Sequence, residues 1–254
     1  MKHILIAAMP LLSLLLLAAA ASALSVEVGV AEKLEGSLKT IQTSNSNGLI
    51  KVVSEFYNSG SIGYTARERL ELNATGHGQT AWSSLAALVP GQRGTFEAYL
   101  YSNTTEDAEI IPRVYFANEI LAADPIVVRG GTLMSREPAF ELYDFRAYDD
   151  MVRLDIRSSK DVGGIVLIPE GYPPGWVFEQ ARISSHMKAG RDAEARMGYH
   201  PDIFSEGAQL KIMAVSEDGR YYGEGAFVMR REAGLSMYIN LFIDGMKNFF
   251  RSAA

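Results

Sequence analysis

Residues 49 to 57 read Leu-Ile-Lys-Val-Val-Ser-Glu-Phe-Tyr, and this stretch decides the fold class. Ile50, Val52 and Phe56 occupy alternating positions, and charged residues stand among the positions between them. Successive side chains of an extended chain point to opposite sides, so this alternation predicts a half-buried β-strand. Asn58-Ser59-Gly60 follows directly, and these turn residues are expected to end the strand.

The same alternation recurs along the chain. In residues 64 to 72, Leu70 and Leu72 share an apolar face, whereas Arg67 and Arg69 lie on the opposite face. Further segments of this kind, bounded by turn residues, lie at residues 96 to 101, 114 to 116, 152 to 157, 210 to 212 and 227 to 229. Several short strands at this spacing predict an all-β protein built of β-sandwiches.

Residues 165 to 168 depart from the alternation because they are continuously apolar. A short apolar run without polar positions is typical of a central strand that is covered on both faces. We therefore expect this strand to lie in the middle of a sheet in the second half of the chain.

A double glycine in Arg129-Gly130-Gly131-Thr132 separates two sets of predicted strands. We expect two immunoglobulin-like β-sandwich domains on either side of this join, and the halves show no obvious repeat. The predicted division is a signal peptide at residues 1–23, a first sandwich at 24–129, a linker at 130–137, a second sandwich at 138–234 and a C-terminal segment at 235–254.

The C-terminal segment breaks the β pattern. Its apolar residues recur at steps of four and three residues, namely Leu235, Ile239, Phe242, Met246 and Phe249. This spacing predicts a short amphipathic helix. The helix is expected to pack on the second sandwich, or to dock on a membrane surface or a partner protein through Phe249 and Phe250. A β-strand over residues 235 to 243 is a further alternative.

The N-terminus has the pattern of a secretion signal. Lys2 precedes an apolar run from residue 4 to residue 17, and Ala21-Ser22-Ala23 offers a small-x-small cleavage site. We expect cleavage after Ala23 and a secreted or cell-surface location. An uncleaved N-terminal anchor is the alternative, because the uncharged stretch approaches the roughly 20 residues that span a bilayer.

Composition excludes several classes of function. The chain has 254 residues, 48% hydrophobic composition, a net charge of −6 and no cysteine. The acidic balance and the lack of a Lys/Arg cluster argue against nucleic acid as a partner. Without cysteine there is no thiol nucleophile, thiolate zinc site, redox pair or disulfide, so stability must come from packing.

The first half resembles a known family. A strand ending in Asn58-Ser59-Gly60, then a charged strand, then Leu88-Val89-Pro90-Gly91 before an aromatic strand, is similar to the CARDB-type immunoglobulin-like modules of prokaryotic surface proteins. The resemblance covers residues 47 to 118. It implies an extracellular spacer or adhesion module without catalysis, and it carries over no functional residues. The second half resembles no family that we recognise.

Signatures of catalysis are missing from the sequence. It has no G-x-S-x-G elbow and no P-loop, and His77, His186 and His200 stand in no two-ligand spacing. We therefore expect no catalytic residue and no cofactor.

Clustered carboxylates raise the question of calcium binding or glycoside hydrolysis. Asp144, Asp149 and Asp150 lie close together, and Glu217-Asp218 lies near a second turn. Their spacing does not fit an EF-hand loop, and aspartates at turns usually serve the turn itself. A glycosidase needs two carboxyl groups about 5 to 10 Å apart, a distance that sequence does not reveal.

Residues 169 to 176, Pro-Glu-Gly-Tyr-Pro-Pro-Gly-Trp, form an unusual stiff stretch. Tyr172 and Trp176 are candidates for ligand or partner contact, because exposed rings stack on flat apolar faces of sugars or peptides. We favour the other interpretation, a tight connection in which Trp176 is a core plug leading into Val177 and Phe178. Exposure of Trp176 on a concave face would favour the platform, and its burial would remove it.

Two acceptor sequons begin at Asn73 and Asn103, where N-glycosylation is a candidate modification. Taken together, the sequence predicts an exported, non-catalytic structural or interaction protein whose partner is a protein or an envelope glycan. The alternatives are a secreted carbohydrate-binding or carbohydrate-processing protein and a subunit of a surface assembly docked through its C-terminal helix.

Overall fold

The structure is a computed structural model, and it describes residues 32–74, 77–102, 107–130, 133–148, 150–201 and 207–230. The described residues form strands, turns and bends and contain no helix, so the all-β prediction is confirmed for them. No helix in this part could cross a membrane. The predicted signal peptide and C-terminal helix, with Phe249 and Phe250, lie outside the described residues.

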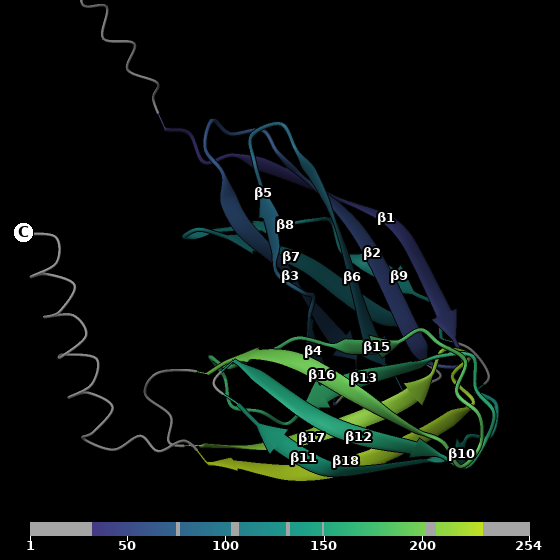
Figure 1. Ribbon diagram of the computed structural model, residues 1–254. Helices are drawn as coiled ribbons and strands as arrows, with labels where there is room; N and C mark the ends of the chain where they lie inside the picture. Colours follow the sequence, from purple (N-terminus) through teal and green to yellow (C-terminus); the bar gives the residue numbers. More distant parts are fainter. Residues whose placement is uncertain are drawn as a thin grey trace, which may run out of the picture. The chain divides into compact units, whose positions relative to one another are not determined.

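The first half of the chain forms two antiparallel sheets, the N-terminal sheet pair (Figure 1). Its strands are β1 (Gly36–Ser46), β2 (Leu49–Asn58), β3 (Tyr64–Ala74), β4 (His77–Trp82), β5 (Ala86–Leu88), β6 (Arg93–Tyr101), β7 (Ala108–Phe116), β8 (Glu119–Ala122) and β9 (Ile126–Val128). One sheet has the order β1-β2-β6. The other has the order β4-β3-β7-β8, with β5 paired to β3 and β9 paired to β7.

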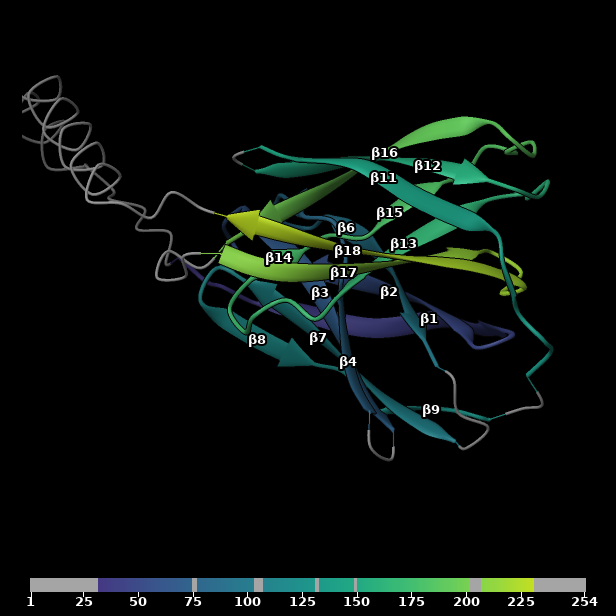
Figure 2. The ribbon, with the colours of Figure 1, turned by 90° about the horizontal axis from the view of Figure 1, so that it is seen from below.

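The second half forms the C-terminal sheet pair, and Figure 2 shows its sheets as two layers. Its strands are β10 (Glu137–Pro138), β11 (Phe140–Ala147), β12 (Met151–Ser158), β13 (Ile165–Glu170), β14 (Val177–Phe178), β15 (Ala181–Ile183), β16 (Asp192–His200), β17 (Gly207–Ser216) and β18 (Tyr221–Arg230). The layers have the orders β10-β18-β17-β13-β15 and β11-β12-β16-β14. Pairing changes from β9 with β7 to β10 with β18, so the chain passes between the pairs after Val128.

The end of β2 shows how local chemistry limits a strand. Asn58 is buried, and its side-chain amide donates to the carbonyl oxygens of Ile62 at 2.9 Å and Leu88 at 3.1 Å. Its side-chain oxygen accepts the Gly60 N–H at 2.9 Å. One asparagine thus satisfies three backbone groups where the ladder ends, and the predicted turn at residues 58 to 60 is confirmed.

The core of the N-terminal sheet pair contains a buried acid. The alternation of β3 that buries Ala66 and Leu70 also points Glu68 inward, where it is 0% exposed. Ser54, also 0% exposed, comes from β2 and is the polar neighbour of this carboxyl group. Burial raises the pKa of Glu68 from 4.5 to about 7, an effect that the Ser54 hydroxyl opposes.

This polar pair divides the apolar core into two clusters. One contains Val52 and Leu70, and the other contains Phe56 and Ala66. Ser54 stands between Val52 and Phe56 in β2, and Glu68 stands between Ala66 and Leu70 in β3. The core is therefore apolar, then polar, then apolar along the strands, which the sequence analysis did not anticipate.

The sheet that contains β13 and β17 is buried on both faces. Ile165 and Leu167 belong to the core of the C-terminal sheet pair, whereas Val166 and Ile168 point to its outer side. All four side chains are 0% exposed, so the prediction for residues 165 to 168 is confirmed.

The outer side is covered by the N-terminal sheet pair. We call the shared set the junction cluster; it consists of Leu49, Tyr99, Val166, Ile168, Met213 and Val215, with Tyr101 packed against it. Leu49 and Tyr99 come from β2 and β6, and the other four buried members come from β13 and β17. Apolar packing thus joins the two sheet pairs directly, in addition to the chain that connects them.

Hydrogen bonds surround the junction cluster. The Tyr99 N–H donates to Gln180 Oε1 at 2.7 Å, and Gln180 Nε2 donates to the Tyr99 carbonyl oxygen at 2.5 Å. Gln79 Oε1 accepts the Tyr101 N–H at 2.8 Å, and Gln79 Nε2 donates to the Glu170 carboxylate. Two glutamines therefore connect backbone or side-chain groups of one sheet pair to the other.

The turn between β1 and β2 provides another connection. Asn47, at a φ of 50°, donates from Nδ2 to the Gly219 carbonyl oxygen at 2.8 Å and accepts the Met134 N–H at 2.7 Å. Arg136 Nη2 donates to the Asn47 carbonyl oxygen at 2.6 Å. A Cβ at Gly219, whose φ is 70°, would lie 2.1 Å from the Ser46 carbonyl oxygen, so this approach requires glycine.

We predict that the junction cluster contributes substantially to stability. Ile168→Ala should lower the free energy of unfolding by about 3 kcal/mol, because it removes buried methyl groups and leaves a cavity. Val228→Ala is the matched control, since Val228 lies on the same outer face but is 69% exposed and should change stability by less than about 0.5 kcal/mol. Denaturant unfolding measures both, and equal effects would contradict the prediction.

We also predict a pH-dependent contribution from Glu68. The unfolded chain loses this proton near pH 4.5 and the folded chain near pH 7, so the contribution of Glu68 to stability is greatest below pH 4.5 and falls up to pH 7. The loss amounts to about 3 kcal/mol.

Glu68→Gln removes the titrating group, so the stability of the variant relative to the native chain should rise by about 3 kcal/mol across that interval. Glu109→Gln, at an exposed position of neighbouring β7, should leave the native pH dependence unchanged. Denaturant titrations at several pH values provide the measurement. A Glu68→Gln protein with the native pH dependence would rule out this assignment.

Candidate functional site

The structure places Trp176 in the core. It is 2% exposed, and its ring lies 5.9 Å from Phe178 and 6.1 Å from Tyr199, nearly parallel to both. Tyr172 is half-buried, with its ring 5.0 Å from Phe178, and burial raises the pKa of its hydroxyl. The interpretation of Trp176 as a stacking surface is therefore wrong, because the indole is enclosed as a core plug.

The clustered carboxylates are engaged locally. Asp144 accepts from Arg146, and Glu217 accepts from Arg182 Nε at 2.5 Å. Asp218 Oδ1 accepts from the Ser216 hydroxyl at 2.6 Å and from the Arg220 N–H at 3.1 Å, which organises the turn between β17 and β18. Within the described ranges, no three His, Asp or Glu side chains are grouped closely enough to hold a metal ion.

The remaining candidate residues from the sequence are exposed or lie outside the described residues. His186 and His200 are exposed, and so is Asn73, where the first sequon begins. Asn103 and Asp149 lie outside the described residues. The structure thus leaves Asn73 accessible for modification.

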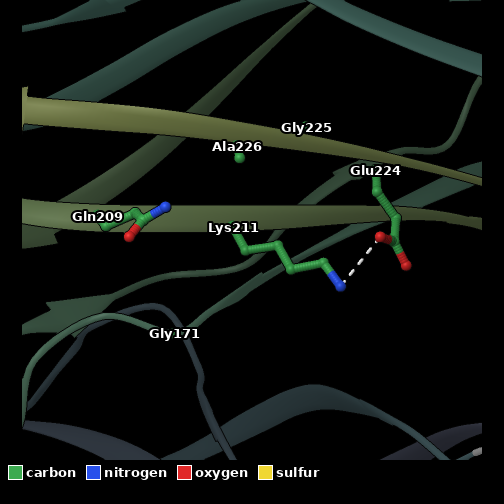
Figure 3. A pocket seen from close by; sticks show the side chains of 6 residues that line it. All are labelled: Gly171, Gln209, Lys211, Glu224, Gly225 and Ala226. Carbon is green, nitrogen blue, oxygen red and sulfur yellow. Dashed lines mark ion pairs between the residues drawn. The ribbon is translucent and has the colours of Figure 1, made fainter.

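A hollow of about 430 Å³ lies on the outer face of the sheet that contains β17 and β18 (Figure 3). Its lining residues are Gly171, Gln209, Lys211, Glu224, Gly225 and Ala226. Lys211 Nζ and Glu224 Oε2 form an ion pair at 3.0 Å across it. Because these charges neutralise each other, the hollow offers a ligand little electrostatic attraction.

Three arginines and two aromatic residues lie together on the outer face of β3, β4 and β7. We call this set the arginine face; it consists of Arg67, Arg69, Arg113, Trp82 and Tyr115. Strand register explains why these residues meet. Arg67 stands opposite Tyr115, and Arg69 stands opposite Arg113 on one side and Trp82 on the other.

Aromatic rings hold the central arginine in place. The Arg69 guanidinium lies over the Trp82 ring at 5.5 Å and donates from Nη1 to the Tyr115 hydroxyl at 3.2 Å. The rings of Trp82 and Tyr115 are 5.1 Å apart. An arginine stacked on aromatic rings keeps its planar group in a fixed orientation, which lowers the entropy lost on binding.

The arginine face has more donors than acceptors. Glu71 is the carboxylate that pairs with Arg69 Nη2 and Arg113 Nε, each at 3.3 Å. Arg67 Nη1 is buried and has no hydrogen-bond partner within the described part of the chain. Burial lowers the pKa of Arg67, and the nearby carboxylate of Glu179 partly offsets that effect. Two guanidinium groups therefore share the Glu71 carboxylate, and the third lies near the Glu179 carboxylate.

The sequence contained part of the signal for this site. The alternation of β3 placed Arg67 and Arg69 on the polar face, but sequence order alone did not show that Arg113 and Tyr115 of β7 lie beside them. That requires the register between two strands more than 40 residues apart, such as Arg67 with Tyr115. A cluster assembled across strands is therefore invisible to analysis of single segments.

Comparison with known proteins gives no family. No family model matches the chain, and no curated protein sequence matches it. Among solved structures, the transglutaminase of red sea bream is similar over 80% of this chain and 32% of its own length, with 10% sequence identity and a TM-score of 0.29. This chain thus spans about a third of that protein, and likeness at this TM-score carries no argument about activity.

We predict that Trp176 is a structural residue. Trp176→Ala should lower the free energy of unfolding by about 4 kcal/mol, because it empties a large volume in the core. Tyr148→Ala is the control at an exposed aromatic residue, 46% exposed, and should cost less than about 1 kcal/mol. Thermal or denaturant unfolding measures both, and a Trp176→Ala protein as stable as the control would contradict the assignment.

Proposed function

We propose that this chain is an exported, non-catalytic interaction protein of the cell envelope or the extracellular space. In this proposal it consists of two immunoglobulin-like β-sandwich modules, the first of them similar to CARDB-type modules. The observation that carries the proposal is the junction cluster, which joins the two sheet pairs through buried side chains.

A fixed junction suits a protein that presents surfaces to partners. When two modules are held by packing and by the hydrogen bonds of Gln79 and Gln180, binding residues on either module keep their relative positions. Less conformational entropy is then lost when a partner binds across both modules. A spacer or adhesion module benefits from such a junction, and this supports an interaction role.

Export is proposed from the N-terminal sequence. Lys2, the apolar run and Ala21-Ser22-Ala23 fit a leader peptide, and the absence of cysteine means that folding outside the cytoplasm requires no disulfide formation. In the alternative form of the proposal, the leader is retained as an anchor. Both forms place the described sheets on the outer side of the membrane.

Fractionation of the organism that encodes the chain tests this proposal. Mass spectrometry should find the chain in the envelope or the medium with Leu24 as its first residue, or intact in the membrane fraction if the leader is retained. The Leu14→Arg, Leu15→Arg double variant, which places charges in the apolar run, should remain in the cytosol. Intact native chain free in the cytosol would refute export.

A further inference from the structure

We propose that the arginine face binds an acidic protein segment, one that presents Asp or Glu side chains beside apolar ones. This inference rests on the proposed interaction role and names the class of partner.

The charge of the arginine face indicates that its partner is negatively charged. The whole chain has a net charge of −6, yet this face carries three arginines against two neighbouring carboxylates, Glu71 beside Arg69 and Arg113 and Glu179 beside Arg67. A local positive region on an acidic protein attracts an anionic group, whereas the acidic remainder of the chain repels a second copy of the same protein. Carboxylates are suited to guanidinium groups because the two can form paired, charge-assisted hydrogen bonds.

The donors are already oriented. Trp82 and Tyr115 fix Arg69, and Glu71 links Arg69 to Arg113. Arg67 Nη1, buried without an acceptor, costs stability in the free protein. Because Nη1 itself is buried, a partner carboxylate would meet the part-exposed remainder of the Arg67 side chain and the Arg113 side chain, which is 37% exposed.

The surroundings favour a protein over a sugar. Ile120, which pairs with Tyr115, is 55% exposed, and Leu85, which directly precedes β5, is 44% exposed. Arginine, tryptophan and tyrosine flanked by apolar side chains are the residues enriched at the centre of protein interfaces. Trp82 is only 9% exposed, so its ring face is not free to stack on a sugar.

Binding can be tested with the full chain purified from its host, whichever fraction contains it. The probe is a short synthetic peptide rich in Glu with two leucines, compared with the same peptide carrying Gln in place of Glu. Isothermal titration calorimetry should detect binding of the Glu peptide, with affinity that falls as salt is raised, and little binding of the Gln peptide.

Arg67→Gln and Arg113→Gln should each weaken binding about tenfold or more, because each removes a charged donor. Arg93→Gln is the matched control, since Arg93 is 64% exposed on the other sheet of the same pair and should change affinity less than about twofold. Thermal unfolding checks that the variants fold. If Arg67→Gln does not fold, Arg113→Gln still tests the inference, because the Arg113 side chain is 37% exposed.

Three results would overturn the inference: no binding of the Glu peptide, equal loss with Arg93→Gln, or tighter binding of polygalacturonate that depends on Arg67. The last would identify an acidic glycan as the ligand. The binding assay uses purified protein, so its result is independent of where the chain is located. Absence of binding would not contradict export, and absence of export would not contradict binding.

Discussion

The fold depends on one constraint, which is that the sheet built from β13 and β17 has apolar side chains on both faces. Water can be excluded from both faces only if each is covered by another layer. The β11-β12-β16-β14 sheet covers one face, and β2 and β6 cover the other around Val166, Ile168 and Met213. Without the N-terminal sheet pair, those side chains would form an exposed apolar patch of the kind that promotes association.

Strand β3 combines the two unusual features of the N-terminal sheet pair. Its inner face carries Glu68 within an otherwise apolar core, and its outer face carries Arg67 and Arg69. Both features reduce stability in the free protein, since an acid and a guanidinium nitrogen are withdrawn from water with few partners. Strong packing at the junction cluster offsets such losses, so the stable part of the molecule supports the part that carries candidate chemistry.

Sequence reasoning succeeded where the signal was local. The alternation in β2, the turn at Asn58 and the doubly covered run in β13 each depend on neighbouring residues, and the structure has all three. It failed where partners are distant. Glu68 occupies an inward-facing position in the alternation of β3, but because it is charged, the sequence did not indicate that it is buried. Arg113 joins the arginine face only through strand register, and the favoured core-plug interpretation of Trp176, which is correct, could not name Phe178 and Tyr199 as the rings that enclose it.

The turn at Asn47 has a mechanical consequence. Strand β1 begins at Gly36, shortly after the N-terminal segment, and its far end leads into Asn47, which is hydrogen-bonded to Met134, Arg136 and Gly219. If the N-terminus is tethered, tension would load the β1–β2 ladder in shear, with many hydrogen bonds sharing the force at once. Part of that force would pass through Asn47 into the C-terminal sheet pair, bypassing the linker. A tethered molecule of this design would resist pulling as one body.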